Sequence, residues 1–185
     1  MVSLSIPYGI SHAAFCDEAP AGIAKGIFPR PLPRRLSAMS KMCLYCVTQL
    51  VQQYGEQVLQ LPLVYASRYG ELERTHALFE EWRDYGEMSP AGFSLSVHNA
   101  TASLIGLASH NQNNSTTLSA GPDTLAMGII EAALLCRDGS DCLLVYGDIY
   151  PTPSAAALVI TQGKTFPLPR NLSELRNTWQ QSFPE

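Results

Sequence analysis

The stretch of sequence with the clearest chemical potential is T-T-L-S-A-G-P-D-T-L-A-M-G-I-I-E-A-A-L-L, residues 116–135. It predicts a short strand, a sharp turn and a buried helix. The start of such a helix stabilises a nucleophile or an anion, because its free N–H groups and its dipole favour negative charge. A cysteine there would have a lowered pKa and would be a good nucleophile. The turn instead contains Ser119, Ala120, Gly121 and Asp123.

Ser119 is the nucleophile that the turn offers in place of a cysteine. A serine nucleophile needs a neighbouring base and an oxyanion hole. The G-x-S-x-G elbow of serine hydrolases does not occur, since the local sequence is T-L-S-A-G. Two interpretations therefore stay open: an acyltransferase or thioesterase that uses Ser119 or a cysteine, or a turn that only packs its helix against a sheet.

The remaining reactive side chains point to structural roles. Cys43 and Cys46 form a C-x-x-C pair inside a run with a helical apolar period. Structural metal sites usually need four ligands, so we predict core cysteines, no metal site and no cofactor. His98 and Asn99 precede a helix of small residues. His98 is either a hydrogen-bonded histidine at a turn or a residue that faces a pocket. Asp148 is interpreted as a turn residue, because it follows a strand and precedes Pro151.

Length and composition predict one globular domain over residues 1–185, with a Pro- and Gly-rich loop at about 17–35 and a tail at about 163–185. The formal net charge of −4 argues against nucleic-acid binding. No apolar run approaches the roughly 18 residues that span a bilayer, so we expect no membrane insertion. The N-terminus lacks the basic segment of a signal peptide, and we expect a cytoplasmic protein.

Strands and helices alternate along the predicted chain. Apolar runs predict strands at 3–10, 61–67, 116–121, 142–148 and 155–161. Helical periodicity predicts helices at 36–54, 68–86, within 89–109 after a loop, at 122–139 and at 171–181, the last with Asn171 as its cap. This order indicates an α/β fold with a mainly parallel, mixed sheet and helices on both of its faces.

Four segments of the chain resemble a known family. They are L-P-L-V-Y-A-S-R-Y-G-E-L-E-R-T-H-A-L-F-E-E-W, S-P-A-G-F-S-L-S-V-H-N-A-T-A-S-L-I-G-L-A-S, L-S-A-G-P-D-T-L-A-M-G-I-I-E-A-A-L-L and C-L-L-V-Y-G-D-I-Y-P. Together they resemble the short β-ketoacyl-synthase-like proteins known as chain-length factors, which accompany ketosynthases in bacterial aryl-polyene clusters. The resemblance covers about residues 35–160, and the order of A-S-R-Y-G-E and S-L-S-V-H-N-A makes it specific.

The resemblance implies a thiolase-like fold, of which this chain matches the N-terminal half of a ketosynthase. It places Ala120 at, or next to, the position of the ketosynthase nucleophile. The H-G-T-G-T-like motif of the second half does not occur, and little sequence after Gly163 is left to form that half. We therefore expect a subunit with no catalytic residue, which pairs as a heterodimer with an active ketosynthase and meets acyl carrier protein through that complex. By resemblance, its interface or tunnel residues are His98, Asn99, Thr101, Ala126 and Gly128.

Overall fold

The computed structural model describes residues 7–33, 36–136, 139–163 and 166–182. A five-stranded sheet has the order β1-β5-β4-β2-β3. Its strands are β1 (Gly9–Cys16), β2 (Leu63–Ala66), β3 (Ser115–Leu118), β4 (Cys142–Asp148) and β5 (Ser154–Thr161). The sheet is mixed, as predicted: β4, β2 and β3 run parallel, while β5 is antiparallel to both β4 and β1. Parallel pairs thus fill one half of the sheet and do not outnumber the antiparallel pairs.

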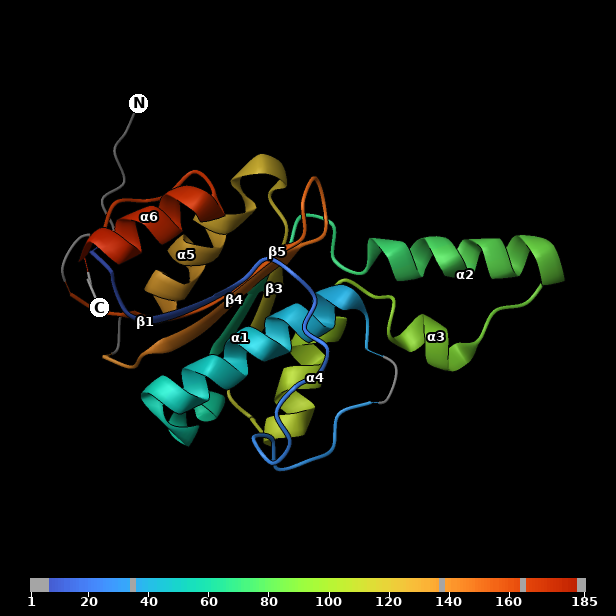
Figure 1. Cartoon of the computed structure of the whole chain (residues 1–185), viewed down its shortest axis with the longest axis horizontal. Helices are drawn as coiled ribbons and strands as arrows, with labels where there is room; N and C mark the ends of the chain where they lie inside the picture. The colour runs from blue at the N-terminus through green and yellow to red at the C-terminus, as the bar shows by residue number, and fades with distance from the viewer. Residues whose placement is uncertain (1–6, 34–35, 137–138, 164–165, 183–185) are drawn as a thin grey trace.

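Helices cover both faces of the sheet (Figure 1). One face packs against α1 (Ala38–Tyr54), the short 3-10 helix η1 (Glu56–Gln60) and α4 (Ala100–Ser109). The other face packs against α5 (Thr124–Leu135) and α6 (Leu172–Ser182). Successive residues of β2 point alternately into the two apolar clusters, so the central strands are buried on both sides, as is usual for parallel strands between helices.

The first strand begins later than the sequence predicts. The prediction was residues 3–10, whereas β1 spans Gly9–Cys16; residues 1–6 lie outside the described part of the chain. Residues 13–16, which lie outside the predicted strand, pair with β5, from Ala13 opposite Leu158 to Cys16 opposite Ala155. Pairing with the distant strand β5 decides where β1 begins and ends, and the Pro and Gly residues that follow Cys16 do not indicate this pairing.

Local signals fix the ends of the longest helix. The Ser37 side chain caps α1 by accepting a hydrogen bond from the backbone N–H of Ser40 at 3.0 Å. Gly55 ends the helix with φ of 98°, a conformation that side chains other than glycine rarely adopt. The predicted helix at 36–54 is therefore confirmed to within two residues, and its C-x-x-C pair lies in the core.

A pair of helices projects from this layered body (Figure 1). The amphipathic helix α2 (Leu72–Tyr85) leads away from the sheet, and α3 (Pro90–Ser94) returns beside it. The sequence predicted α2 but treated α3 as loop. None of the helices in the described parts of the chain combines the length and the hydrophobicity that crossing a bilayer requires.

Candidate functional site

The turn between β3 and α5 has the backbone of a helix start. After Leu118 the chain passes through Ser119 and Ala120 into a single 3-10 turn, η2 (Gly121–Asp123), before α5 begins at Thr124. The backbone N–H of Ala120 donates to Thr124 Oγ1 at 3.0 Å, and that hydroxyl donates to the Gly121 carbonyl at 2.7 Å. Gly121 has φ of +58°. The predicted strand, turn and helix are confirmed, with the α-helix two residues later than expected.

Ser119 lies at this turn without the contacts of an activated nucleophile. Its side chain is exposed, and its hydroxyl donates to the carbonyl of Arg68 at 3.2 Å. Each of the four histidines contacts another group. His98 Nε2 lies 2.8 Å from the Ser67 carbonyl oxygen. The side chains of the other three contact Ser11 (His12), Glu80 (His76) and Arg30 (His110). The structure therefore pairs Ser119 with a backbone carbonyl and not with a base.

The five cysteines lie in the core, away from the turn. All five are buried and unbridged. Burial raises the pKa of the Cys43 and Cys142 thiols well above their usual range and that of Cys136 to about 11. A hydrogen bond with Cys46 lowers the pKa of Cys16 to about 7, but Cys16 ends β1, at the opposite edge of the sheet from β3. The described residues contain no group of three His, Cys, Asp or Glu side chains arranged to hold a metal ion.

Asp148 is a buried anchor beside the turn, and its interpretation as a turn residue was wrong. It is the last residue of β4 and is only 4% exposed. Its Oδ1 accepts hydrogen bonds from Ser67 Oγ at 3.0 Å and from the backbone N–H groups of Arg68 and Tyr69 at 2.8 and 3.1 Å. Its Oδ2 accepts from the Tyr146 hydroxyl at 2.9 Å. Since Ser119 donates to the Arg68 carbonyl, Asp148 fixes the segment that contacts the turn between β3 and α5.

Glu71 is a second buried carboxylate that the sequence analysis missed. Its Oε1 accepts from Ser37 Oγ at 2.9 Å, from Ser40 Oγ at 2.8 Å and from Thr101 Oγ1 at 3.3 Å. These partners belong to the N-terminal ends of α1 and α4, where the helix dipoles favour an anion. Two serines three residues apart, at 37 and 40, and an acidic residue some thirty positions later form no recognisable motif, so the sequence does not reveal the contact between Glu71 and these serines.

The predicted interface residues differ in how exposed their side chains are and in what they contact. Thr101 is fully buried and shares a 2.9 Å hydrogen bond with Ser40, while Asn99 is exposed at the start of α4. Ala126 is half-buried on α5. Gly128 faces the sheet, where an added Cβ would lie 2.7 Å from Ala66 Cβ. Its small size therefore serves packing within the chain.

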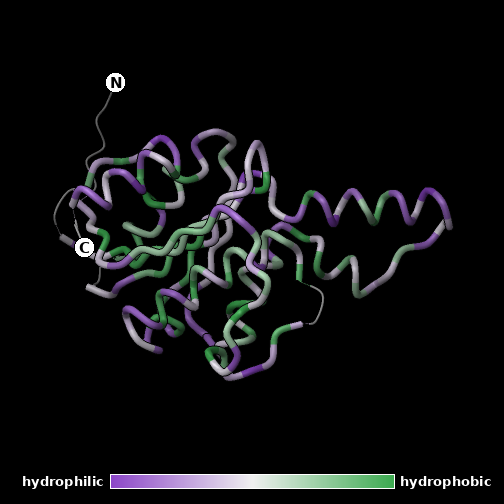
Figure 2. Tube along the Cα trace, in the orientation of Figure 1, coloured by the Kyte–Doolittle hydropathy of each residue, from purple (hydrophilic) through white to green (hydrophobic). Residues whose placement is uncertain are grey.

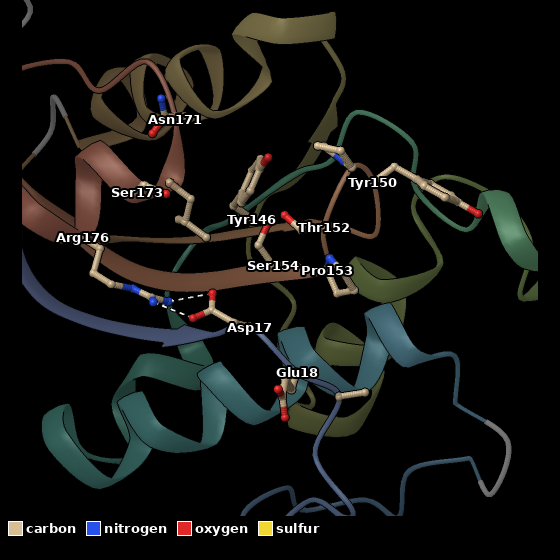
Figure 3. A pocket seen from close by; sticks show the side chains of 13 residues that line it. Asp17, Glu18, Tyr146, Tyr150, Thr152, Pro153, Ser154, Asn171, Ser173 and Arg176 are labelled. Carbon is tan, nitrogen blue, oxygen red and sulfur yellow. Dashed lines mark hydrogen bonds and ion pairs between the residues drawn. The ribbon is translucent and has the colours of Figure 1, made fainter.

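A groove opens at the same end of the sheet as the turn (Figure 3). Its volume is about 670 Å³, and it lies between the end of β1, the β4–β5 connection and the first turn of α6. Arg176 crosses it to bind Asp17 in a bidentate ion pair, with Nη2 to Oδ1 at 2.9 Å. No sequence motif pointed to this groove, because its walls come from three distant parts of the chain.

Comparison with known proteins identifies the family to which this fold belongs. A family model described as the β-ketoacyl synthase, N-terminal domain, matches residues 17–181. No curated protein matches the chain. Among solved structures, a chain in the complex of the ketosynthase ApeO with its chain length factor ApeC from Xenorhabdus doucetiae matches with a TM-score of 0.71 and 24% identity, over 97% of this chain and 92% of that one.

Two further structures share the fold over part of their length. A β-ketoacyl synthase from Burkholderia phymatum STM815 matches with a TM-score of 0.57 and 15% identity, over 77% of this chain and 46% of that one. OleA H285D from Xanthomonas campestris matches with a TM-score of 0.52 and 14% identity, over 84% of this chain and 56% of that one. The chain thus spans about half the length of these two proteins. The family and the thiolase-like fold that the sequence resemblance implied are confirmed, and the chain belongs to the β-ketoacyl synthase family, whose N-terminal domain it matches.

Proposed function

We propose that this chain is a non-catalytic, chain-length-factor-like subunit. It pairs with an active β-ketoacyl synthase of aryl-polyene biosynthesis and shapes the tunnel that holds the growing acyl chain. The observation that carries the proposal is the strand, turn and helix around Ala120: these elements are formed, and the position at or next to which the family resemblance places the nucleophile holds a methyl group in place of a thiol.

The chemistry of condensation explains why this substitution matters. Decarboxylative Claisen condensation needs a thiolate to hold the acyl group and donors that stabilise the developing oxyanion. An alanine side chain forms no acyl-enzyme. Ser119, the adjacent hydroxyl, is paired with the Arg68 carbonyl and would need an activating base. The geometry therefore supports a subunit that leaves the chemistry to its partner, in preference to an acyltransferase or thioesterase.

The edge of the sheet supports a partner. β3 is an edge strand, paired with β2 on one side only, and it leads directly into the turn at Ala120. Exposed strand edges carry unpaired N–H and C=O groups that readily add a further strand. The structure from Xenorhabdus doucetiae is named as a ketosynthase in complex with its chain length factor, and one chain of it matches this chain over nearly the whole length of both chains. Acyl carrier protein would meet this chain through the assembled pair.

Co-expression with an active ketosynthase of aryl-polyene biosynthesis tests the proposal. We expect the two proteins to co-purify as a heterodimer by size-exclusion chromatography with light scattering. With acyl- and malonyl-loaded carrier protein, the pair should produce a ketoacyl product and this chain alone should produce none. A well-behaved monomer that ignores the ketosynthase, or condensation by this chain alone, would overturn the proposal.

A further inference from the structure

The projecting pair of helices has a surface that this chain leaves largely uncovered. We define the arm as residues 72–94, which contain α2 and α3. Within Leu72–Tyr85, all of which the structure describes, Leu78 is the single buried residue. Figure 2 shows apolar and polar residues alternating along this helix, well away from the apolar sheet. A helix with an apolar side normally packs that side against a core, so the arm calls for a partner.

Large apolar side chains gather on one side of α2. Leu72, Phe79, Trp82 and Tyr85 are 43%, 61%, 54% and 78% exposed. At 100° per residue, they fall with Leu78 within an arc of about 140°. The second helix covers only the Leu78 side, since a Cβ on Gly92 would lie 3.0 Å from Leu78 Cδ2. Phe93 of α3 adds a further aromatic ring that is 57% exposed.

Both ends of the arm are anchored to the body by buried or partly buried hydrogen bonds. At the entry, Asp148 holds the backbone of Arg68 and Tyr69, and Glu71 binds the starts of α1 and α4. At the exit, Thr75 Oγ1 donates to the Ser96 carbonyl at 3.1 Å, and His98 Nε2 lies 2.8 Å from the Ser67 carbonyl oxygen. The aromatic surface is thus presented in a fixed direction.

The arm leaves the body next to the free edge of the sheet. The N–H of Ser67, at the arm's entry, donates to the carbonyl of Leu118, the last residue of β3, at 3.2 Å. The following residue of the edge, Ser119, contacts Arg68. Whatever pairs with the outer edge of β3 therefore lies close to the root of the arm.

The area that a stable interface buries indicates that the partner at the edge of β3 also covers the arm. A stable protein pair buries about 800 Å² on each partner. β3 has four residues, so its edge is only about 13 Å long and supplies a small part of that area. A fully buried aromatic side chain contributes roughly 150–250 Å², so the exposed parts of Phe79, Trp82, Tyr85 and Phe93 add roughly 400–600 Å². We infer that this aromatic surface of the arm docks on the ketosynthase subunit, beside the strand-edge contact.

The charge of the arm indicates what it meets. Residues 72–87 contain five acidic side chains and two basic ones, a net charge of −3. On the same helical wheel, Glu73, Glu80 and Asp84 lie on the side opposite the apolar arc, so the charges face away from the surface that the arc contacts. The complementary surface is therefore mainly apolar, and an apolar patch on the ketosynthase fits this description better than a highly charged protein does. The inference rests on the function proposed above.

Removing two rings tests the docking surface. In the full-length chain, we expect Phe79→Ser combined with Trp82→Ser to weaken binding to the co-expressed ketosynthase at least about 30-fold, because central aromatic residues dominate interface energies. The matched control combines Leu134→Ser with Leu168→Ser, which removes two apolar side chains that are 39% and 44% exposed outside the arm. The control should bind within about threefold of the unaltered chain. Circular dichroism and melting temperature verify that all variants fold.

The outcomes separate this inference from the proposed function. If the unaltered chain binds no ketosynthase, both fall. If the unaltered chain binds and the Phe79/Trp82 variant binds equally well, the docking inference alone is wrong. If the variant instead dissociates a homodimer of this chain and leaves ketosynthase binding unchanged, the occupant is a second copy, which also overturns the inference.

Discussion

Ala120 stands where the local backbone would make a side chain reactive. The residue lies between an edge strand and a helix start, and its N–H is held by Thr124. The same backbone in a catalytic relative would surround a thiolate with N–H dipoles. Under the proposed function, the chain keeps the geometry at this position and lacks the functional group.

Restoring the thiol should reveal the backbone's effect. We predict that a cysteine introduced by Ala120→Cys has a lowered pKa, because the start of α5 favours the thiolate. The pH profile of iodoacetamide alkylation, followed by peptide mass spectrometry, measures this pKa. Ser140→Cys provides an exposed control cysteine away from a helix start. The midpoint for Ala120→Cys should lie about one pH unit below that of the control, and equal midpoints would count against an intact nucleophile turn.

Asp148 should matter for stability far more than a turn residue would. Asp148→Ala leaves Ser67, Tyr146 and two backbone N–H groups without their acceptor in a buried site. We expect a loss of about 2–4 kcal/mol in the free energy of unfolding, measured by urea denaturation. Asp141→Ala, at a partly exposed carboxylate that accepts one hydrogen bond from Tyr54, is the control and should cost less. A loss below about 1 kcal/mol for Asp148→Ala would refute the anchoring role.

The sequence revealed the turn at Ala120 but not the two buried carboxylates. The turn is a local pattern, since strand, glycine, proline and helix follow one another within twenty residues. Asp148 meets Ser67 across 81 positions, and Glu71 meets Ser40 across 31. The residue pattern within either segment contains no signal for these long-range hydrogen bonds. Burial of these carboxylates becomes visible only once the sheet brings the strand ends together.

At the scale of elements, α5 is held against the sheet by a close approach. Gly128 is buried, and a Cβ there would lie 2.7 Å from Ala66 Cβ on β2 and 3.2 Å from Leu144 Cδ1 on β4. The backbones of β2 and β4 cannot readily shift to make room, because both are central strands with hydrogen-bonded neighbours on each side. The position of the helix start, and with it the turn at Ala120, depends on this contact.

A methyl group at Gly128 should therefore push the helix away. We predict that Gly128→Ala lowers the free energy of unfolding by about 1–3 kcal/mol through overpacking. Gly106→Ala in α4 is the matched control, since an added Cβ there meets nothing closer than Asn111 O at 4.0 Å. The control should be neutral or stabilising by up to about 1 kcal/mol, because alanine favours helices over glycine. Equal effects of the two substitutions would contradict the close approach.

The outward side of the same helix tests the tunnel. Ala126 is half-buried, and we predict that Ala126→Leu keeps the ketosynthase complex intact and shortens its products, because the larger side chain fills tunnel space. Mass spectrometry of carrier-bound products beside size-exclusion chromatography of the pair gives the answer. Dissociation of the pair would place Ala126 in packing, and an unchanged product length in an intact pair would exclude this helix from the tunnel.

Most elements were predictable because their signals are local. Amphipathic periodicity and capping residues located α1, α2 and α5, and apolar runs located the central strands. The exceptions depend on distant contacts: β1 extends to Cys16 because β5 pairs with it, and α3 forms in a segment predicted as loop, where Ser89 caps Gly92 and the helix packs against Leu78. A five-residue helix is too short for its periodicity to stand out.

For the whole molecule, the arm and the free edge of β3 explain one another. Each leaves groups exposed: β3 pairs with β2 on one side only, and α3 covers only part of the aromatic surface of the arm. Both lie at the end of the sheet that holds the Ala120 turn. A single partner seated there would complete the sheet, cover the aromatic surface of the arm and reach the turn at Ala120, which is the arrangement that the proposed tunnel-shaping subunit needs.

Locating the acyl group in the working pair tests the central claim most directly. The pair is incubated with acyl-loaded carrier protein and stopped during turnover, and intact-mass spectrometry then weighs each subunit. We predict that the ketosynthase carries the acyl adduct, that this chain keeps its unmodified mass, and that ketoacyl product forms only when both subunits are present. An acyl adduct on this chain, at Ser119 or at any cysteine, would contradict the account of a subunit that shapes the tunnel without performing the chemistry.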